Sequence, residues 1–333
     1  MVHMEKSRWG ILGAAAIAVD KIIPARQQSP SCLLEALASR SLEKARLVSD
    51  RFRIPKAYDS YEALLSDKEI DAVYIPLPNS LHVEWSVHAL HAGKHVLCEK
   101  PIGINATEVK RLADAAARLP ELKIMEAFMY RFHPQWQKVR EIIRTGQIGE
   151  LRQVHSIFSF FDEDPSSILN IEKLGGGSLL DIGCYGISLS RYLFDDEPRK
   201  LLSYLEIDGR FETDRHGSAI MVFGTDKTAT FICHTQLSDF QKVTILGSSG
   251  RIEMNTPFIV EPEEPAVLQV YSGSKAETIT LDPCNQYSLQ FEQFVRSIFD
   301  QNSMTIPLQD SLNNMKVLDA IVKSAKSGTW QFL

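Results

Sequence analysis

Lys100, Asp181 and Tyr185 are the side chains of this sequence whose types and spacing suit proton exchange with a bound substrate. Asp181 and Tyr185 are four residues apart, so both project from one face if the segment 179–191 is helical. Three glycines at 175–177 leave space in front of them. A phenol has an unperturbed pKa of about 10, so Tyr185 needs a nearby cation to act near neutral pH. We expect Lys100 to be that cation.

Lys100 follows the strand that we predict for the apolar segment 95–98, and Pro101 follows Lys100. Open sheets of parallel strands bind their ligands at the carboxyl ends of the strands. Proline restricts the backbone of Lys100 and makes a cis peptide bond more common. A cation here can orient a hydroxyl group and lower the pKa of a nearby acid. The alternatives are a solvated Lys100, a Tyr185 packed in a core and an Asp181 that caps a helix.

A second chemical feature lies near the start of the chain. The apolar segment 9–13 predicts a buried strand, and the segment 17–27 predicts a helix directly after it. The residues between them have the spacing of the dinucleotide-binding pattern G-x-G-x-x-A: Gly13, Ala14, Ala15, Ala16, Ile17 and Ala18. Gly13 permits the tight turn, and the N–H groups at the helix start suit a pyrophosphate, although the Ala15 methyl narrows its approach. The alternative is an ordinary turn from strand to helix.

The end of the second predicted strand distinguishes between two nicotinamide cofactors. NAD-binding units carry Asp or Glu there to hold the ribose 2′-hydroxyl. Here the strand 33–38 is followed by Ser39, Arg40 and Ser41, and Glu35 lies in its middle. The guanidinium of Arg40 suits a 2′-phosphate, with hydrogen bonds from the two serines. The segment therefore favours NADP, with NAD as the second possibility, unless Arg40 only solvates a loop.

The order of the predicted elements divides the chain in two. The first 127 residues alternate short apolar segments with amphipathic segments, which is typical of a parallel sheet with helices on both faces. We therefore predict an α/β protein in which residues 1–127 form a Rossmann dinucleotide-binding domain. Strands dominate from about residue 150 on. Residues 128–333 are predicted to form an α+β domain built on a large, mostly antiparallel open sheet.

Several segments together are similar to a known family. Glu99-Lys100-Pro101 resembles the corresponding segment of the Gfo/Idh/MocA oxidoreductases, named for glucose-fructose oxidoreductase and inositol dehydrogenase. The resemblance covers nearly the whole chain, through the segments 78–82, 126–134, 146–149, 175–185 and 247–250. It implies that the Lys100–Pro101 bond is cis and that Lys100 points at the substrate and the nicotinamide. Many members have His where this chain has Tyr185. Members that resemble dihydrodiol dehydrogenases and NADP xylose dehydrogenases have Tyr.

The same resemblance implies further contacts. Pro78, Asn79, His82 and Glu99 are expected on the ribose or nicotinamide side of the cofactor, although His82 is equally compatible with a helix start. Arg131 and His133 are expected to reach the substrate pocket, or to serve the structure of the segment 126–134. Tyr185 is expected to be the general acid/base, assisted by Lys100. Asp181 is expected to bind a substrate hydroxyl or to hold Lys100.

Composition excludes several classes of protein. The net charge of −6 gives no basic excess for nucleic acid. No apolar run is long enough to cross a membrane, and the first ten residues do not resemble a signal peptide. Five dispersed cysteines without a CxxC pair, and histidines that do not cluster, indicate a cytoplasmic protein without a metal site. The predicted strand 153–161 carries Phe158, Phe160 and Phe161, so we expect an apolar sheet face and a homodimer or higher homo-oligomer.

These observations predict an oxidoreductase. Its reaction would transfer a hydride between NADP(H) and a small polyhydroxylated molecule such as a sugar, a keto-sugar or a dihydrodiol. Two other classes remain as alternatives. A cofactor-binding regulator without turnover would not need Lys100, Asp181 and Tyr185 together. An NAD-assisted glycoside hydrolase would retain NAD, which Arg40 disfavours.

Overall fold

A computed structural model describes residues 6–27, 31–300, 303 and 305–333 of the chain. The first five residues, part of the segment expected not to be a signal peptide, lie outside that description. The chain forms two compact units. The first comprises residues 1–129 and 285–312, and the second comprises residues 130–284 and 313–333.

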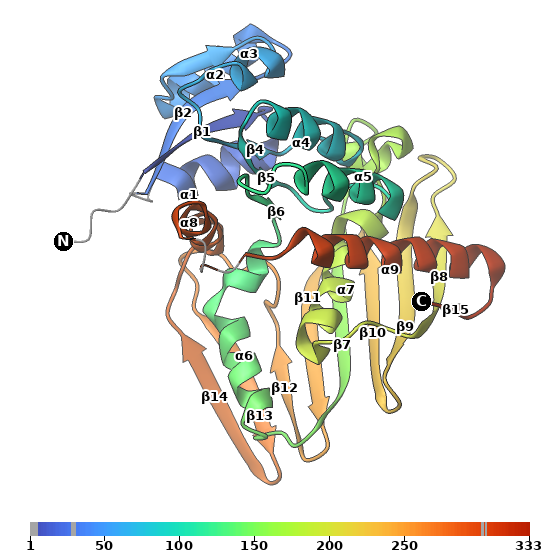
Figure 1. The fold of residues 1–333 in the computed structure, drawn as a ribbon. Helices are drawn as coiled ribbons and strands as arrows, with labels where there is room; N and C mark the ends of the chain where they lie inside the picture. The colour runs from blue at the N-terminus through green and yellow to red at the C-terminus, as the bar shows by residue number, and fades with distance from the viewer. Residues whose placement is uncertain (1–5, 28–30, 301–302, 304) are drawn as a thin grey trace. The chain divides into compact units, whose positions relative to one another are not determined.

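The first unit is built on a sheet of six parallel strands (Figure 1). The spatial order β3-β2-β1-β4-β5-β6 is that of a Rossmann fold, which confirms the predicted fold class. The strand bounds are β1 Ser7–Leu12, β2 Cys32–Ala38, β3 Lys56–Tyr58, β4 Ala72–Ile75, β5 His95–Cys98 and β6 Ile124–Glu126. Every residue of β4, in the middle of the sheet, is buried. Short apolar strands of this kind are covered on both faces.

Helices of the first unit begin where polar side chains supply caps. Ser41 accepts a hydrogen bond from Lys44 N, and Asn105 accepts one from Glu108 N at 3.0 Å. The helix bounds are η1 Ala18–Ile22, α1 Ile23–Gln27, α2 Leu42–Phe52, α3 Tyr61–Leu65, η2 Asn79–Leu81, α4 His82–His91, α5 Ala106–Ala116 and α8 Gln286–Phe299. The η1 segment is a π-helical turn that continues into α1.

Helix α8 belongs to the first unit, although residues 128–333 were predicted as one domain. Its apolar face packs on the sheet: the ring centres of Phe291 and Phe294 lie 5.0 and 5.7 Å from that of Trp9. Ser288 Oγ also donates to Ala25 O at 2.9 Å. The domain division at residue 127 remains a prediction. The compact units differ from it because the apolar face of α8 packs against β1.

The second unit is built on a nine-stranded sheet in the order β14-β13-β12-β11-β7-β10-β9-β8-β15. Only β7 and β10 pair in parallel among the described strands, so the sheet is mostly antiparallel, as predicted. The strand bounds are β7 Leu151–Phe161, β8 Lys200–Ile207, β9 Asp214–Phe223, β10 Lys227–His234, β11 Gln236–Gly247, β12 Gly250–Met254, β13 Ala266–Ser272, β14 Lys275–Leu281 and β15 Gln331–Phe332.

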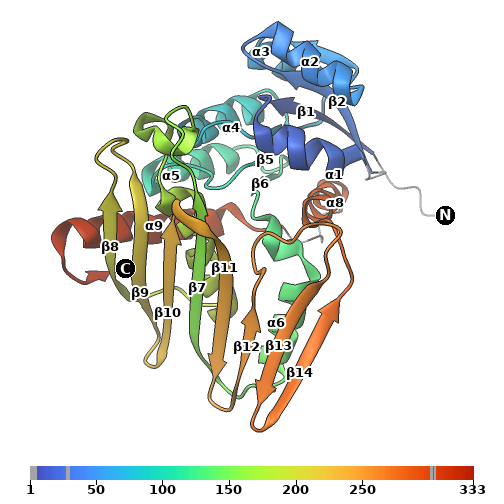
Figure 2. The same cartoon turned by 180° about the vertical axis from the view of Figure 1, so that it is seen from behind.

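The second unit has long helices and shorter helical turns, and its long helices α6, α7 and α9 lie on one face of this sheet (Figure 1), while Figure 2 presents the opposite face. Their bounds are α6 Pro134–Arg144, η4 Ile168–Asn170, η5 Glu172–Leu174, η6 Leu179–Gly183, α7 Cys184–Phe194 and α9 Leu308–Ser327, of which residues from 313 on belong to this unit; η3 Met129–Phe132 joins the two units. Phe158 is 7% exposed on the helix-covered face, so its expected place in an exposed apolar surface is wrong. Side chains alternate along β7, and Phe161 lies on the opposite face at 60% exposure.

Candidate functional site

The turn after β1 has the geometry that a pyrophosphate requires. Gly13 has φ +117°, and its N–H donates to Ala38 O at 2.9 Å. A Cβ at Gly13 would lie 3.0 Å from Leu77 Cδ2, so a side chain there would strain the backbone and displace Leu77 slightly. The helix that begins at Ala16 closes its first bond from Val19 N to Ala15 O, which leaves earlier N–H groups without helical acceptors. These residues fit a dinucleotide.

Arg40 lies next to this turn because β1 and β2 are paired in parallel. The Ser39 hydroxyl, 7% exposed, accepts from Ser41 N at 3.3 Å, and Ser41 in turn caps α2. Arg40 is exposed. Burial raises the pKa of the Tyr61 phenol, and the neighbouring Arg40 guanidinium opposes that rise. An exposed cation beside the phosphate turn fits the 2′-phosphate of NADP.

The segment after β5 forms a tight polar turn. The Lys100–Pro101 peptide bond is cis, as the family resemblance implies. The Tyr74 hydroxyl donates to Glu99 Oε1 at 2.5 Å, and Glu99 Oε2 accepts from Lys100 N at 3.2 Å. Ile102 N donates to Glu126 Oε1 at 2.9 Å. Side chains of the neighbouring strands β4 and β6 therefore hold the backbone on both sides of Lys100.

The His82 ring connects the turn at Lys100 and Pro101 to the backbone after β4. Its ring is 1% exposed, with Nδ1 lying 2.7 Å from Pro101 O and Nε2 lying 2.7 Å from Leu77 O. Burial lowers the pKa of His82 to about 4, against the opposing effect of both carbonyls. Pro78 and Asn79 lie between these anchors, at the start of η2. Both ring nitrogens of His82 contact the backbone, so its expected contact with the cofactor remains a prediction.

Asp181 and Tyr185 lie in consecutive helical segments of the second unit, η6 and α7. Tyr185 is 3% exposed, and its ring centre lies between 5.3 and 5.8 Å from those of Tyr130, Phe158 and Phe258. This cluster fixes the plane of the phenol. Tyr185 is therefore packed in a core, which was the alternative to a catalytic role. The two are compatible, because these aromatic neighbours contact the ring of Tyr185 and a catalytic role would use its hydroxyl.

Asp214 on β9 holds the start of the helical segment that carries Asp181 and Tyr185. Its Oδ2 accepts from Ser178 Oγ at 2.7 Å and from Leu179 N at 2.6 Å. Burial raises the pKa of the Asp214 carboxyl to about 6, although these hydrogen bonds oppose the rise. Sequence reasoning missed Asp214. The only signal for it was the glycine segment 175–177, because a Cβ at Gly177, which has φ +113°, would overlap Asp214 Oδ1.

Arg131 and His133 make contacts that shape the second unit. Arg131 donates to Ser188 Oγ at 2.8 Å, and its guanidinium carbon lies 5.1 Å from the Tyr192 ring centre, so it braces α7. His133 is 1% exposed and caps α6 by accepting from Gln135 N. Burial lowers the pKa of His133 to about 4. The contacts that we observe for Arg131 and His133 are structural, as the alternative to substrate binding supposed. Their expected contact with substrate remains a prediction.

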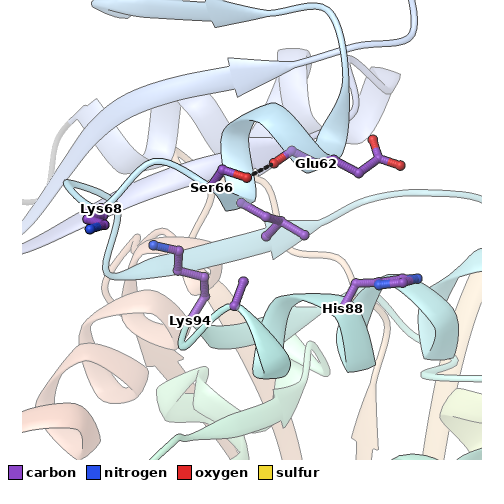
Figure 3. A pocket seen from close by; sticks show the side chains of 7 residues that line it. Glu62, Ser66, Lys68, His88 and Lys94 are labelled. Carbon is purple, nitrogen blue, oxygen red and sulfur yellow. Dashed lines mark hydrogen bonds between the residues drawn. The ribbon is translucent and has the colours of Figure 1, made fainter.

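A pocket of about 400 Å³ on the first unit contains none of the predicted site residues (Figure 3). It lies between α3 and the end of α4, and Glu62, Ser66, Lys68, His88 and Lys94 line it. Across the part of the chain that the structure describes, no group of three or more His, Cys, Asp or Glu side chains could hold a metal ion. Among the same residues, no helix is both long and apolar enough to cross a membrane.

Two family models match the chain in tandem. The first is described as the oxidoreductase family with an NAD-binding Rossmann fold and matches residues 7–127. The second is described as the GFO/IDH/MocA C-terminal domain and matches residues 136–253. Both matches fall on the segments where the Rossmann sheet and the second sheet were found.

Individual relatives match almost from end to end. An uncharacterized oxidoreductase of Rhizobium meliloti is 41% identical over 98% of this chain and 99% of its own. D-xylose 1-dehydrogenase (NADP(+)) 2 of Haloferax volcanii is 36% identical over 96% of this chain and 98% of its own. A solved 3-ketoreductase from Actinomadura kijaniata, in complex with NADP and TDP-benzene, has a TM-score of 0.91 at 29% identity, covering 96% of this chain and 98% of that one. The chain therefore belongs to the GFO/IDH/MocA family of oxidoreductases.

Proposed function

We propose that this protein transfers a hydride between NADP(H) and a carbon bearing oxygen in a small polyhydroxylated substrate. The observation that carries the proposal is the turn at Lys100, a cation at the same carboxyl edge of the Rossmann sheet as the phosphate turn at Gly13. Open parallel sheets bind cofactor and substrate at this edge. Sugars, keto-sugars and dihydrodiols are the substrate classes that we propose.

Arg40 supports NADP over NAD. The guanidinium is exposed at the end of β2, where a carboxylate would hold the ribose hydroxyl of NAD. A xylose dehydrogenase relative carries NADP(+) in its name, and the Actinomadura ketoreductase was solved with NADP. When bound, NADP would supply or accept the hydride. Gly13, Ala15, Ala16 and Ile17 would bind its pyrophosphate, and Ser39 and Arg40 its 2′-phosphate.

The protein's own side chains would move the proton and place the substrate. Tyr185 is the proposed general acid/base, with its ring held by the aromatic cluster and its hydroxyl directed at the reacting oxygen. Lys100 would lower the pKa of that phenol through its charge. Asp181 would accept a hydrogen bond from a second substrate hydroxyl. Solved forms of the Actinomadura ketoreductase include one with a tyrosine changed to phenylalanine and others with a lysine changed to alanine or glutamate.

Other predicted site residues would act through their neighbours. His82 and Glu99 would position Lys100 through the backbone contacts described above. Pro78 and Asn79 would line the ribose side of the cofactor, between the anchors of His82. Arg131 would keep α7, and therefore Tyr185, in place.

A spectrophotometric panel tests the function. Purified protein would be mixed with NADP⁺ or NAD⁺ and with aldoses, inositols and dihydrodiols, and with NADPH and keto-sugars in the reverse direction. We expect formation or loss of NADPH with at least one polyhydroxylated substrate, and slower turnover with NAD⁺. Binding of NADP(H) without turnover in either direction would favour a cofactor-binding regulator. Cleavage of a chromogenic glycoside without net reduction would favour the NAD-assisted hydrolase.

We also propose that the second sheet pairs with another copy of the chain. Its helix-free face among the described residues carries exposed apolar side chains: Phe161, Tyr204, Ile220, Ile232 and Phe240. Apolar surface of this kind usually finds a partner. Light scattering at micromolar concentration should give twice the chain mass of 37.5 kDa or a higher multiple, and a monomer would contradict the proposal.

The five free cysteines suit the reducing cytoplasm that we propose as the location of the protein.

A further inference from the structure

A pocket of the first unit collects positive charge away from the phosphate turn. Its volume is about 420 Å³, and residues from the end of α1, the start of β2 and the end of α2 line it. Lys6, Arg26 and Arg53 contribute to the lining, and none of the described residues that line it is acidic. Because β1 and β2 are parallel, the phosphate turn lies at their carboxyl edge and this pocket at their amino edge. The pocket is therefore distinct from the candidate cofactor site.

Arg26 is buried without an acceptor. It is 1% exposed, and none of its three guanidinium nitrogens has a hydrogen-bond partner among the described residues. Its guanidinium carbon lies 4.7 Å from the ring centre of Phe291 and 6.0 Å from that of Trp9. Aromatic faces attract the cation, yet they leave its five N–H donors unmatched. Burial lowers the pKa of Arg26 to about 9, with Glu292 opposing, so the group remains charged at neutral pH.

The pocket of Figure 3 offers a direct comparison within the same unit. It also contains a buried cation, Lys94, which is 5% exposed. Lys94 Nζ donates to Asp67 O and to Ile70 O, each at 2.7 Å, and Glu62 lines the same pocket. The protein itself therefore satisfies Lys94. Arg26 differs because its pocket brings the further cations Lys6 and Arg53 near it, and among the described residues no group accepts a hydrogen bond from it.

Arg53 adds a second cation in an unfavourable backbone conformation. It ends α2 with φ 55° and ψ 42°, in the left-handed region that glycine adopts most easily. Glycine at this position would relieve the backbone, but it would remove a charge from the pocket. The rest of the lining is mainly apolar, from Leu33, Leu34, Phe52 and Ile54.

We propose that this pocket binds a small organic anion with an apolar body, such as a medium-chain carboxylate. The negative head would pair with the exposed Arg53, and a change of rotamer would bring the Arg26 guanidinium, whose nitrogens are inaccessible in this structure, to the same anion and to the acceptors that it lacks. The apolar body would lie against Leu33 and Phe52. A volume of about 420 Å³ is within the range of small-molecule sites and accommodates a chain of roughly eight carbons.

Octanoate is the probe for a first test. Isothermal titration of the full chain with octanoate, in saturating NADP⁺ to occupy the cofactor site, should give one site and a raised thermal midpoint. Octan-1-ol has the same apolar body without the charge, and it should bind much more weakly. Absence of heat and of a midpoint shift at millimolar octanoate, or equal binding of the alcohol, would overturn the proposal.

Three variants locate the site. Arg26→Met keeps the length of the side chain and removes its charge, so octanoate should bind about tenfold more weakly or worse. Arg53→Gly should raise the thermal midpoint of the free protein and yet weaken octanoate binding, which a purely structural role would not produce. Arg118→Met, an exposed arginine after α5, is the matched control and should change neither property. Unchanged octanoate affinity in Arg53→Gly would contradict the proposal even if Arg26→Met failed to fold.

Discussion

Replacement of Asp214 tests most sharply how the second unit holds the helical segment that carries Asp181 and Tyr185. Asp214→Ala removes two hydrogen bonds at the start of η6, those from Ser178 Oγ and Leu179 N. A hydrogen bond of this kind contributes about 1 kcal/mol net to stability. We therefore expect the variant to lose about 2 kcal/mol of unfolding free energy at pH 8, measured by equilibrium unfolding in urea.

The pH dependence of that loss has a definite sign. The pKa of Asp214 is about 6 in the folded protein, above the ordinary value of 3.8. The folded state therefore binds the proton more tightly than the unfolded state. The stability from this proton is fully present below the unfolded pKa and is lost as pH rises through the folded pKa.

The cost of Asp214→Ala should accordingly grow by about 1 kcal/mol between pH 8 and pH 5. An ordinary ion-paired carboxylate would give the opposite trend, with a cost that shrinks in acid. A cost that falls toward pH 5, or one too small to measure at both pH values, would refute this account of Asp214. Asp208→Ala is a useful contrast, because Arg210 and Gln236 hold the pKa of Asp208 well below its usual range.

Three further substitutions test individual contacts. Arg40→Ser should raise the KM for NADP⁺ roughly tenfold or more and leave the KM for NAD⁺ nearly unchanged; equal changes would argue against a 2′-phosphate contact. Gly177→Ala should lower unfolding free energy by more than about 1 kcal/mol, whereas Gly224→Ala, whose Cβ would meet no atom within 4 Å, should cost less in the same urea titration. His82→Phe should lower stability by about 1 kcal/mol, because the neutral imidazole has one N–H and donates to one of its two neighbouring carbonyls, and an unchanged urea midpoint would contradict that role.

Local patterns were sufficient to predict the fold. The turn at Gly13 and the capped helix at Asn105 depend on neighbouring residues, so the sequence shows them directly. The place of α8 was not predictable, because its amphipathic pattern indicates an apolar face without naming its partner. Trp9, which receives that face, lies about 280 residues earlier in the chain.

The sequence indicated which types of residue belong to the candidate site, but it did not indicate which atoms their side chains contact. His82 was expected near the cofactor and His133 near the substrate because the family resemblance implied those contacts. In the structure their nitrogens contact backbone groups or cap a helix, which depends on atoms that the sequence does not place. Asp214 was missed because it lies within a strand, 36 residues from Ser178, with no motif of its own. Only the close approach at Gly177 connects the two segments.

Proton transfer by Tyr185 is the step on which the proposed NADP-dependent oxidation or reduction depends. Its most direct test compares kcat for Tyr185→Phe with that of the unaltered protein, on the best substrate of the panel, together with NADPH affinity by fluorescence titration. We expect kcat to fall at least about a hundredfold while NADPH affinity is unchanged, because general acid–base groups contribute effects of that size. A variant that keeps most of its kcat would contradict the assignment of Tyr185.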